Sequence, residues 1–572
     1  MDQIRMVLAV VLSILVFIVW DYFFIPDQPQ TPPKHASQGV ETPPPRATPG
    51  QEKATDRPGE LQRPEKTAET FEKPEALPAS PDETANTVVV ETDLFTAELS
   101  EKGASVTRLE LKKYKEENKA DAPLKNLVSA EHNPSGSLHL DMPGSGLSGL
   151  SSGLYSLDAA RENAPGRIRV GERQRSVLFS RVLDNGVIVE KKYTFSPDSY
   201  LIRLDVMVKN GSSAPVGGDL SVSLSRYFAD EGSRFVFEGP SALLNGQLEE
   251  VKIKNIEKKE SVAGDIRWVA IQNRYFMSAI IPTGDTGSSD QPSAMQLEHP
   301  GKKVVKAAYV MPAGVIAPNT MKAYQFEVFM GPKSVQTLRH TGYALDKAVN
   351  FGWFDFIAKP CLWLMNQIYK ILPNYGIAII IITLIFKTIF WPLGNKSYKS
   401  MGEMKKLQPL MAEIREKYKN DKKRMNEEMM NLYKTYKINP LGGCLPILVQ
   451  IPVFIAFYRM LYQAIELRHA PFFLWIDDLS APDRLFSFDV TIPFMHPPAG
   501  IPVLTLIMGA TMFLQQKLQP APGDPSQAKI MMLMPIMMTV IFVNFPSGLV
   551  LYWLVNNVVS IAQQHLVTNR NT

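Results

Sequence analysis

The last third of the chain holds a series of apolar segments, and these constrain the fold more than any other feature. Five of them, between residues 373 and 568, are predicted to cross a bilayer with a hydrocarbon core of roughly 30 Å. They cover about residues 375–393, 441–462, 502–516, 530–544 and 549–566. The mean hydropathy of -0.08 averages these segments with very polar stretches, so a purely soluble enzyme is disfavoured.

A further apolar segment lies at the amino end. Residues 6–20 are apolar apart from Ser13 and continue into Tyr22-Phe23-Phe24-Ile25, where a cleaved signal peptide would carry small residues. Residues 1–25 are therefore predicted to form an uncleaved signal-anchor helix. Residues 26–86 are rich in proline and poor in large apolar residues, which predicts a disordered linker because such a segment buries too little apolar surface to fold.

Residues 87–340 carry short β-branched and aromatic runs, separated by turn signals such as Asn210-Gly211. This pattern predicts an all-β domain, a mostly antiparallel sandwich. The runs that predict strands are residues 88–90, 187–189, 200–206, 220–224, 235–237, 268–271 and 323–330. The Gly/Ser-rich stretch at residues 143–153 predicts a loop.

Motifs of hydrolase, nucleotide and metal chemistry are absent or out of context. Residues 149–153 match G-x-S-x-G, but a nucleophile elbow follows a buried strand and opens a helix, whereas this stretch is of low complexity on both sides. Residues 331–334 and 394–397 end like phosphate loops but lack the leading glycine. The eight histidines are scattered, and the two cysteines cannot form a disulfide framework. We therefore expect no enzyme activity, no cofactor and no metal site.

The distribution of charge predicts the topology. Residues 351–372 are predicted to form an interfacial amphipathic helix, because Asp355, Lys359, Asn366 and Lys370 fall on one helical face. Residues 395–439 are strongly basic, which places them in the cytoplasm, and their apolar residues repeat at three and four, which predicts an antiparallel helical hairpin. Composition leaves open whether this hairpin is a docking surface or simply solvated. Six crossings then leave both termini in the cytoplasm and residues 87–340 outside.

Lys387 is a charged residue inside the otherwise apolar segment 375–393. A charge at the bilayer centre costs about 2.5 to 3.5 kcal/mol, so such residues are functional by default and usually face a wet cavity. The alternative is that the long side chain reaches the cytoplasmic interface at Trp391, roughly 6 Å away along the helix axis. Other polar groups either line the same cavity or bond between helices: Thr383, Gln450, Thr505, Gln515 and Asn556.

Methionines crowd the segment 530–544, with Met531, Met534 and Met538 among them. Their unbranched, polarizable side chains suit a surface that accepts many different apolar partners. In a membrane span they serve equally well as filler, and the sequence leaves both interpretations open.

Several short motifs occur in order along the membrane part. They are Asn439-Pro440-Leu441-Gly442-Gly443-Cys444, Gln450-Ile451-Pro452, Ala470-Pro471-Phe472, Trp475-Ile476, Asp478-Leu479-Ser480 and Phe545-Pro546-Ser547-Gly548-Leu549-Val550-Leu551-Tyr552. In these motifs the chain resembles the YidC-type membrane protein insertases of Gram-negative bacteria, relatives of the mitochondrial oxidase-assembly and chloroplast albino-type insertases. The resemblance extends over the whole chain. It implies a five-span helical insertase core, an amino-terminal signal anchor and a periplasmic β-supersandwich.

The resemblance also implies a function, that of a membrane protein insertase and chaperone of the bacterial inner membrane. Family members carry a positive residue, usually Arg, in a hydrophilic groove; Lys387 takes this position here, so the charge is kept while the planar fork of donors is lost. The groove-lining candidates are Thr383, Gln450, Thr505, Gln515, Tyr552 and Asn556. The candidates for a hydrophobic slide, along the third and fifth spans, are Ile447, Ile451, Met531, Met534 and Met538.

The implied partners are nascent membrane proteins, the lipid bilayer and the Sec translocon. Ribosome and signal-recognition components are expected to meet the basic hairpin and the carboxyl tail. Two other function classes stay open from the residues alone. A polytopic secondary transporter would show several intramembrane charges and repeated halves, and a membrane-anchored periplasmic carbohydrate-binding receptor would carry an aromatic-lined pocket in the β domain.

Overall fold

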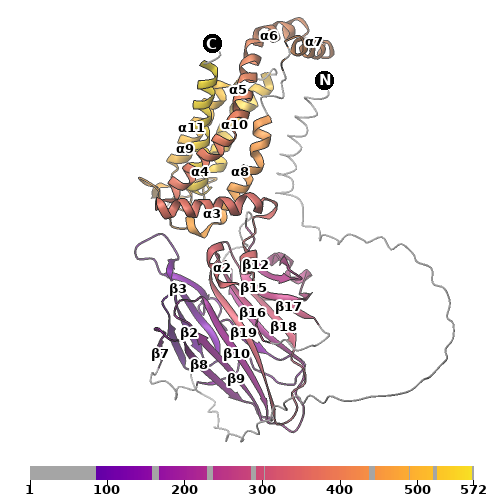
Figure 1. Cartoon of the computed structure of the whole chain (residues 1–572), viewed down its shortest axis with the longest axis vertical. Coiled ribbons are helices and arrows are strands. Elements are labelled where there is room, and N and C mark those ends of the chain that lie inside the picture. Colours follow the sequence, from indigo (N-terminus) through magenta and orange to yellow (C-terminus); the bar gives the residue numbers. More distant parts are fainter. Residues whose placement is uncertain are drawn as a thin grey trace, which may run out of the picture. The chain divides into compact units, whose positions relative to one another are not determined.

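The computed structural model describes residues 85–157, 166–228, 236–284, 292–301, 303–436, 438, 445–488, 490–519 and 525–569. The predicted signal anchor, and the predicted linker up to residue 84, lie outside these ranges. Within them, a β-rich half is followed in the sequence by a helical half (Figure 1), and the helices α6 and α7 belong to a separate compact unit.

The β-rich half contains three sheets. The largest has the strand order β13 (Gln247–Glu250), β12 (Gly239–Leu244), β15 (Ile266–Gln272), β16 (Phe276–Pro282), β19 (Thr320–Pro332), β10 (Leu201–Asn210), β9 (Val187–Phe195), β8 (Arg175–Val182) and β6 (Ser156–Leu157). The second has the order β4 (Leu124–Ser129), β3 (Ser105–Lys115), β2 (Phe95–Ser100), β1 (Thr87–Glu91) and β7 (Arg167–Arg169). The third has the order β14 (Ser261–Gly264), β17 (Ser293–Gly301), β18 (Val304–Pro312), β11 (Asp219–Tyr227) and β5 (His139–Asp141).

Alternation of side chains explains how these strands form a core. In β10, Ile202, Leu204 and Val206 are buried while the residues between them are partly exposed, as expected for strands with one face on the core. The described pairs in the three sheets are antiparallel, for example β10 with β19, and β1 with β7 is the parallel exception. The prediction of a mostly antiparallel, all-β domain is therefore confirmed.

Most predicted strand runs fall within observed strands, and one prediction is wrong. Val236 and Phe237 of the predicted run 235–237 are not in a strand, and residue 235 lies outside the described residues. Val236 is buried without pairing in a sheet. Burial in an irregular segment therefore accounts for the apolar character that had suggested a strand.

Lys191 and His139 are among the titratable side chains that are buried inside the β domain. Lys191 of β9 has no exposed surface, and its ammonium donates to the carbonyls of Gly103 (3.0 Å), Ala104 (2.7 Å) and Leu138 (2.8 Å). Nε2 of the buried His139 lies 3.2 Å from the Gly136 carbonyl, whereas its Nδ1 has no hydrogen-bond partner in the described part of the chain. Burial lowers the pKa of Lys191 to about 7 and, together with the nearby Lys191, the pKa of His139 to about 4.

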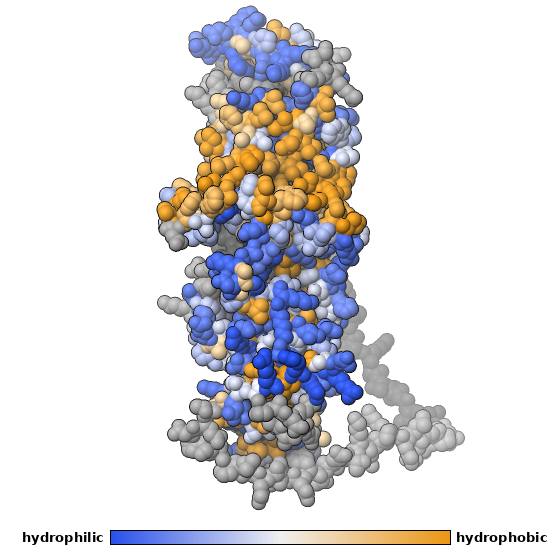
Figure 2. Space-filling model, turned by 90° about the vertical axis from the view of Figure 1, so that its left-hand side faces the viewer, coloured by the Kyte–Doolittle hydropathy of each residue, from blue (hydrophilic) through white to orange (hydrophobic). Residues whose placement is uncertain are grey.

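The helical half contains α2 to α11. Its helices are α2 (Val335–Thr341), α3 (Asp355–Ile371), α4 (Tyr375–Ile389), α5 (Trp391–Lys406), α6 (Gln408–Lys417), α7 (Lys422–Thr435), α8 (Leu445–Gln463), α9 (Val503–Leu518), α10 (Pro525–Phe542) and α11 (Ser547–Asn569). A two-stranded sheet of β20 (Leu485–Phe488) and β21 (Ala499–Ile501) lies in the connection between α8 and α9. Hydrophobic side chains gather over the helices of this half, in contrast to the largely hydrophilic β domain (Figure 2).

None of the described helices is by itself both long enough and apolar enough to cross a membrane. The pair α4 and α5 passes that criterion together, with a bend of 65° between the two helices. The bend follows from Trp391-Pro392, because proline lacks the N–H that a continuous helix needs and is tolerated in the first turn of a new helix. The predicted crossing at residues 375–393 thus contains a helix end at Ile389.

The amphipathic helix expected at residues 351–372 corresponds to α3, which begins at Asp355. Its apolar residues divide between two environments: Leu362 and Met365 are buried, whereas Phe356 and Trp363 are exposed. Lys359 forms an ion pair with Asp355 (2.7 Å), one turn earlier.

The basic stretch between α5 and α8 contains two described helices, α6 and α7, as the periodicity predicted. The side chain of Asp421 caps α7 by accepting from the backbone N–H of Arg424 (3.0 Å). A small core of Leu407, Met411 and Tyr433 holds the two helices together. Met429 and Leu432, which belong to the apolar repeat that predicted the hairpin, pack against this core.

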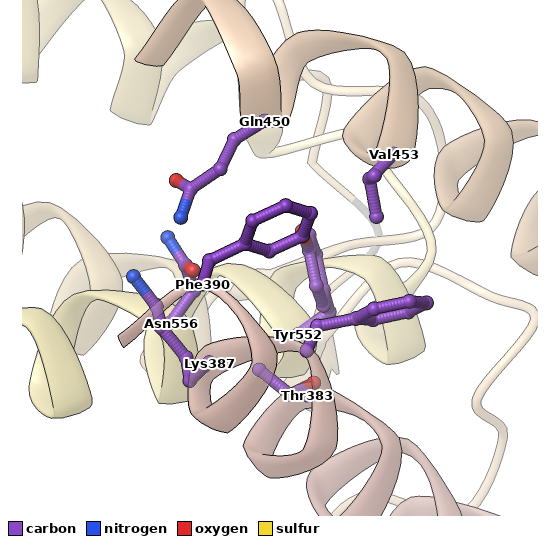
Figure 3. A pocket seen from close by; sticks show the side chains of 8 residues that line it. Thr383, Lys387, Phe390, Gln450, Val453, Tyr552 and Asn556 are labelled. Atoms are coloured by element: carbon purple, nitrogen blue, oxygen red, sulfur yellow. The ribbon is translucent and has the colours of Figure 1, made fainter. Parts of the chain in front are cut away.

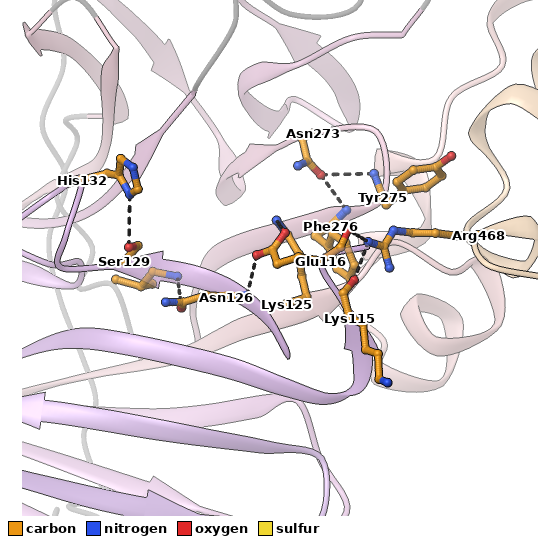
Figure 4. Close-up of polar contacts among 11 residues, drawn as sticks. Lys115, Glu116, Lys125, Asn126, Ser129, His132, Asn273, Tyr275, Phe276 and Arg468 are labelled. Carbon is orange, nitrogen blue, oxygen red and sulfur yellow. Dashed lines mark hydrogen bonds and ion pairs between the residues drawn. The ribbon is translucent and has the colours of Figure 1, made fainter. Parts of the chain in front are cut away.

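The β domain and the α8–α9 connection are joined by polar contacts (Figure 4). Arg468 donates to the carbonyls of Lys115 (2.5 Å) and Glu116 (2.9 Å) at the end of β3, and its guanidinium lies 5.6 Å from the ring centroid of Phe276. Nearby, Arg274 donates to the carbonyl of Tyr462 at the end of α8 (2.5 Å). Main-chain carbonyls are therefore the principal acceptors at this junction.

Candidate functional site

The candidate site is built around Lys387 in the last turns of α4. Asn374 caps this helix by accepting from the backbone N–H of Ile377 (3.1 Å), and the β-branched and aromatic run that follows buries one face against α11 and α3. Lys387 lies on the buried side, with only 7% of its surface exposed.

Lys387 borders a cavity of about 20 Å³, which is large enough for one water molecule. The cavity is lined by Thr383, Phe386, Lys387, Phe390, Gln450, Val453, Tyr552 and Asn556. These residues come from α4, α8 and α11 and from Phe390, which caps the end of α4. In Figure 3 the amide groups of Gln450 and Asn556 point toward each other, and the Lys387 side chain rises beside Asn556.

The ammonium of Lys387 donates to the hydroxyl of Ser560 on α11, at 2.7 Å. That hydroxyl in turn donates to the carbonyl of Asn556 one turn earlier, at 2.7 Å. An ammonium has three donors, and this single hydroxyl is the hydrogen-bond partner that the described residues supply. Lys387 is therefore held in place while keeping donor capacity for another acceptor.

No acidic residue lies on the helices that line the cavity. The neighbouring helix α5 carries one, Glu403, and its side chain is exposed. The sequences of α4, α8, α9, α10 and α11 contain neither Asp nor Glu. Among the described residues, no carboxylate forms an ion pair with Lys387. A buried positive charge without a counter-ion of its own favours an anionic group that arrives from outside.

The structure brings most of the predicted groove residues together. Thr383, Gln450, Tyr552 and Asn556 line the same cavity as Lys387. The Thr383 hydroxyl is already engaged, because it donates to the carbonyl of Ile379 (2.7 Å). The amides of Gln450 and Asn556 and the ring of Tyr552 make the cavity partly polar and partly apolar.

Two predicted groove residues lie elsewhere on α9. Thr505 is fully buried near the start of the helix, and its hydroxyl has no partner among the described residues. Gln515 is half-buried one turn before the helix ends. Neither residue lines the cavity at Lys387.

The predicted slide residues lie on α8 and α10. Ile451 and Met534 are exposed, whereas Met531 and Met538 are half-buried. Ile447 is in α8, but its side chain lies outside the described part of the chain.

The sequence-based prediction missed Ser560. A signal was present, since Ser560 follows Asn556 by four residues and therefore lies on the same face of a helix. The lining residues Phe386, Phe390 and Val453 were also missed, because apolar side chains in an apolar segment do not stand out. In the described part of the chain, no group of three His, Cys, Asp or Glu residues is arranged to hold a metal ion.

Comparisons with known proteins match almost the whole chain. Residues 87–364 match the family model of the YidC periplasmic domain, and residues 367–572 match the family model described as 60Kd inner membrane protein. The membrane protein insertase YidC of Syntrophobacter fumaroxidans is 40% identical over 575 residues, which covers 98% of this chain and 99% of that protein. The one from Pelobacter propionicus is 38% identical over 563 residues, covering 98% of both chains.

A solved structure, an active YidC insertase crystal structure with the first transmembrane domain resolved, has 19% sequence identity to this chain. The match covers 84% of this chain and 92% of that one, with a TM-score of 0.36.

Proposed function

The chain belongs to the YidC family of membrane protein insertases, and from this premise we propose that it moves newly made proteins into the bacterial inner membrane through the cavity at Lys387. The family is one of insertases rather than enzymes, and it implies an inner-membrane protein with a periplasmic domain. The transporter and carbohydrate-receptor alternatives gain no support from the matched families.

One observation carries the proposal: a buried lysine with a single hydroxyl partner, on helices that contain no acid. A client protein whose outward-going tail carries an Asp or Glu faces a barrier of a few kcal/mol at the bilayer centre. An ion pair at 4 Å is worth about 4 kcal/mol at an effective dielectric of 20. One lysine in the cavity is therefore sufficient to offset one acidic residue of the client.

The direction of transfer follows from the membrane potential. With the inside negative, the potential draws an anionic tail outward with about 2.3 kcal/mol per charge per 100 mV. The attraction to Lys387 lowers the barrier, and the potential supplies the direction. No nucleotide hydrolysis is required for either step.

The apolar segment of the client would leave the cavity along α8 and α10. Ile451 and Met534 are exposed and offer apolar contacts to a helix that moves into lipid. Methionine is suited to such a surface because its unbranched chain adapts to clients of different shape. Met531 and Met538, half-buried beside it, would support this slide, and Ile447 is assigned to it on the same helix as Ile451.

The proposed topology has five spans in the helical core, preceded by the signal-anchor span. The domains are the anchor (residues 1–25), the linker (26–86), the periplasmic domain (87–340), the interfacial helix (351–372) and the insertase core (373–568). Both termini are then cytoplasmic. The basic hairpin at residues 395–439 would meet ribosome and signal-recognition components together with the carboxyl tail, and the insertase would work alone or beside the Sec translocon, also as a folding chaperone.

A point charge, rather than a planar fork, is sufficient for this mechanism. Family members usually carry Arg where this chain has Lys387. The lysine keeps the positive charge but lacks the planar set of hydrogen-bond donors of a guanidinium. We therefore expect Lys387→Arg to remain active, whereas Lys387→Ala removes the attraction.

Insertion into proteoliposomes with an imposed potential tests the proposal. The client is a single-span protein with one Asp in a short outward tail, and protease protection measures insertion. We expect Lys387→Ala to slow insertion about tenfold or more, since 1.4 kcal/mol corresponds to a factor of ten. The matched control is Lys517→Ala, because Lys517 is an exposed lysine in the last turn of α9.

A second client, with Asn in place of its tail Asp, separates charge attraction from general damage. This client should insert equally well with wild type and with Lys387→Ala. If Lys387→Ala inserts the acidic client at the wild-type rate, the groove-charge mechanism is wrong and the apolar slide must carry the function.

A further inference from the structure

The connection between α8 and α9 carries a group of exposed apolar side chains that no step of insertion uses. The group consists of Phe486, Phe488, Val490, Ile492 and Phe494, which are 68%, 42%, 63%, 38% and 83% exposed. They occupy β20 and the loop that leads toward β21, called here the apolar hairpin (residues 485–501). An exposed apolar patch of this kind marks a binding surface rather than ordinary solvent-facing chain.

Two aromatic residues of the apolar hairpin adopt an unfavourable backbone conformation. Phe486 and Phe494 have φ values of 57° and 65°, in the left-handed region that bulky residues rarely adopt. Phe486 has no register partner in β21, because it lies at the register shift between Leu485 and Ser487. A Cβ at Gly500 would lie 2.4 Å from the Phe486 carbonyl oxygen, so only glycine admits this close approach. Strain of this kind is retained where the surrounding structure enforces it, often at functional sites.

Polar contacts fix the base of the hairpin to the end of α10. Arg484 donates to the carbonyl of Val543 (2.8 Å) and to Oδ1 of Asn544 (3.3 Å). Oδ1 of Asn544 also accepts from the backbone N–H of His496 (2.8 Å), and its amide donates to the carbonyl of Phe494 (2.7 Å). The hydrogen-bonding groups are thus used at the base, and the apolar side chains project from it.

The apolar hairpin continues an apolar surface of α10. Met537, Val540 and Ile541 are exposed on the last two turns of α10, and the anchoring residue Asn544 follows directly after them. In an inner-membrane protein, exposed apolar side chains on such a helix face lipid. The hairpin extends the same surface beyond the end of the helix.

The composition of the apolar hairpin fits lipid better than a protein partner. Its sequence carries two ionisable residues, Asp489 and His496, of which Asp489 lies outside the described residues. Protein interfaces combine apolar anchors with a polar rim and roughly one hydrogen bond per 100–200 Å². Here the backbone N–H of His496 and the carbonyl of Phe494 are already used toward Asn544. The exposed side chains of the described hairpin residues are apolar apart from Ser487, Thr491 and His496.

We propose that the apolar hairpin inserts its aromatic and aliphatic side chains among the lipid acyl chains of the outer leaflet, next to the outer end of α10. This inference concerns a lipid-binding element of the connection and goes beyond the insertion of clients through the cavity. It rests on the proposed topology only in placing the α8–α9 connection on the outer side.

Spin labelling of the full-length chain in nanodiscs tests the inference without any client. Single cysteines at Phe486, Val490 and Phe494 are introduced after Cys361→Ala and Cys444→Ala, and nitroxide collision rates with oxygen and with a water-soluble nickel chelate report immersion. We expect the three labels to favour oxygen, as acyl-chain positions do. Ser213→Cys on the exposed surface of the β domain is the aqueous control.

Labels that collide with the nickel chelate as often as the Ser213→Cys label would overturn the inference. Labels that are aqueous in the empty membrane but become immobile when a client is added would show a protein as the occupant, which also overturns it. A Thr491→Cys label keeps all the apolar side chains of the hairpin and should also favour oxygen. An aqueous Thr491→Cys label would overturn the inference.

The outcome is independent of the groove-charge mechanism. Immersed labels in a protein whose Lys387→Ala variant inserts normally would keep the hairpin inference and reject the cavity mechanism. Aqueous labels in a protein that depends on Lys387 would do the reverse.

Discussion

Two buried lysines, Lys191 in the β domain and Lys387 in the helical half, are surrounded in opposite ways. Lys191 has no exposed surface and donates to three main-chain carbonyls, which match the three donors of an ammonium. Lys387 retains 7% exposure, donates to one hydroxyl and borders a cavity. The two environments differ in how many acceptors the protein itself provides.

The difference separates a structural charge from an available one. A buried ammonium with a full set of acceptors links the segments that supply them, here the segments around Gly103 and Leu138. A buried ammonium with spare donors and no acid on its helices can bind an acid that is not part of the chain. The extent of burial does not distinguish these two cases. The number of hydrogen-bond acceptors that the protein supplies to the ammonium does distinguish them.

The largest expected effect is on stability at Lys191. Lys191→Met should lower the free energy of unfolding of the β domain by about 3 kcal/mol, because three buried carbonyls lose their donor. Lys387→Met, which removes one donor from a hydroxyl that keeps its bond to the Asn556 carbonyl, should lower stability by about 1 kcal/mol or less. Pulse proteolysis of the full chain in urea measures both.

Lys192→Ala is the control, since Lys192 is the exposed neighbour on the same strand. A Lys191→Met protein as stable as Lys192→Ala would break the comparison, because full satisfaction of the ammonium would then contribute nothing.

The second effect is a pH dependence confined to the β domain. Burial lowers the pKa of His139 to about 4, so between pH 6.5 and pH 4 the unfolded chain binds a proton that the folded chain does not. The contribution of His139 to stability is therefore complete above pH 6.5 and falls as the pH drops toward 4, by about 2 to 3 kcal/mol at pH 4.5. Lys191, with its pKa near 7, adds no slope in this window because it is protonated in both states below pH 7.

His139→Gln removes the titratable group and so isolates its contribution to the pH dependence of stability, since the Gln amide can still donate to the Gly136 carbonyl. Urea unfolding at pH 7 and pH 4.5 should show a smaller loss in the variant than in wild type. Equal losses in both proteins would mean that His139 is protonated without penalty in the folded state.

The third prediction concerns a variant that places an acidic side chain of the protein itself next to Lys387. Asn556 lines the same cavity, and Asn556→Asp places a carboxylate there. We expect insertion of the acidic-tailed client to fall about tenfold, because the internal carboxylate competes for the ammonium with an advantage of at least 1.4 kcal/mol. Initial rates in proteoliposomes measure this.

Asn556→Ala removes the amide without adding charge and should slow insertion much less. If Asn556→Asp inserts the acidic client normally, Lys387 does not act through its availability, and the contrast with Lys191 loses its functional meaning.

The smallest effect concerns Ser560, the one hydrogen-bond partner of Lys387 among the described residues. Ser560→Ala removes the hydroxyl that positions the ammonium, and we expect a change of about threefold in insertion, in line with one hydrogen bond of about 0.5 to 1.5 kcal/mol. Ser560→Thr keeps the hydroxyl and should restore the wild-type rate. A loss as large as that of Lys387→Ala would show that Ser560 acts on the client directly.

Sequence patterns predicted the helical half and its charged residue well, because apolar segments and a lysine within one are local features. Residues 375–393 contain α4, and Lys387, Gln450 and Asn556 meet at one cavity. The bend at Trp391-Pro392 was not predicted as such, although a proline there favours a helix end.

Sequence patterns predicted less where the burial of a residue depends on segments that are distant in the sequence. Lys191 occupies an inward position of β9, in step with Val187, Val189 and Tyr193, yet its acceptors lie 53 to 88 residues away and no local pattern announces them. Ser560 was missed because one hydroxyl among several polar residues of α11 is not distinctive. The run at residues 235–237 shows the converse, since apolar residues were buried there without joining a sheet.

The junction at Arg468 has a consequence for how the β domain can vary. Its acceptors are main-chain carbonyls of Lys115 and Glu116, so this contact depends on the path of the β3–β4 turn and not on the turn's side chains. One side chain of the turn adds a contact of its own, because the amide of Asn118 donates to the carbonyl of Asp477 (2.9 Å). The contacts of Arg468 therefore survive substitutions in the turn while its length is kept. Insertions or deletions, by contrast, would move both carbonyls at once and detach the domain, so tolerance at this surface is governed by spacing.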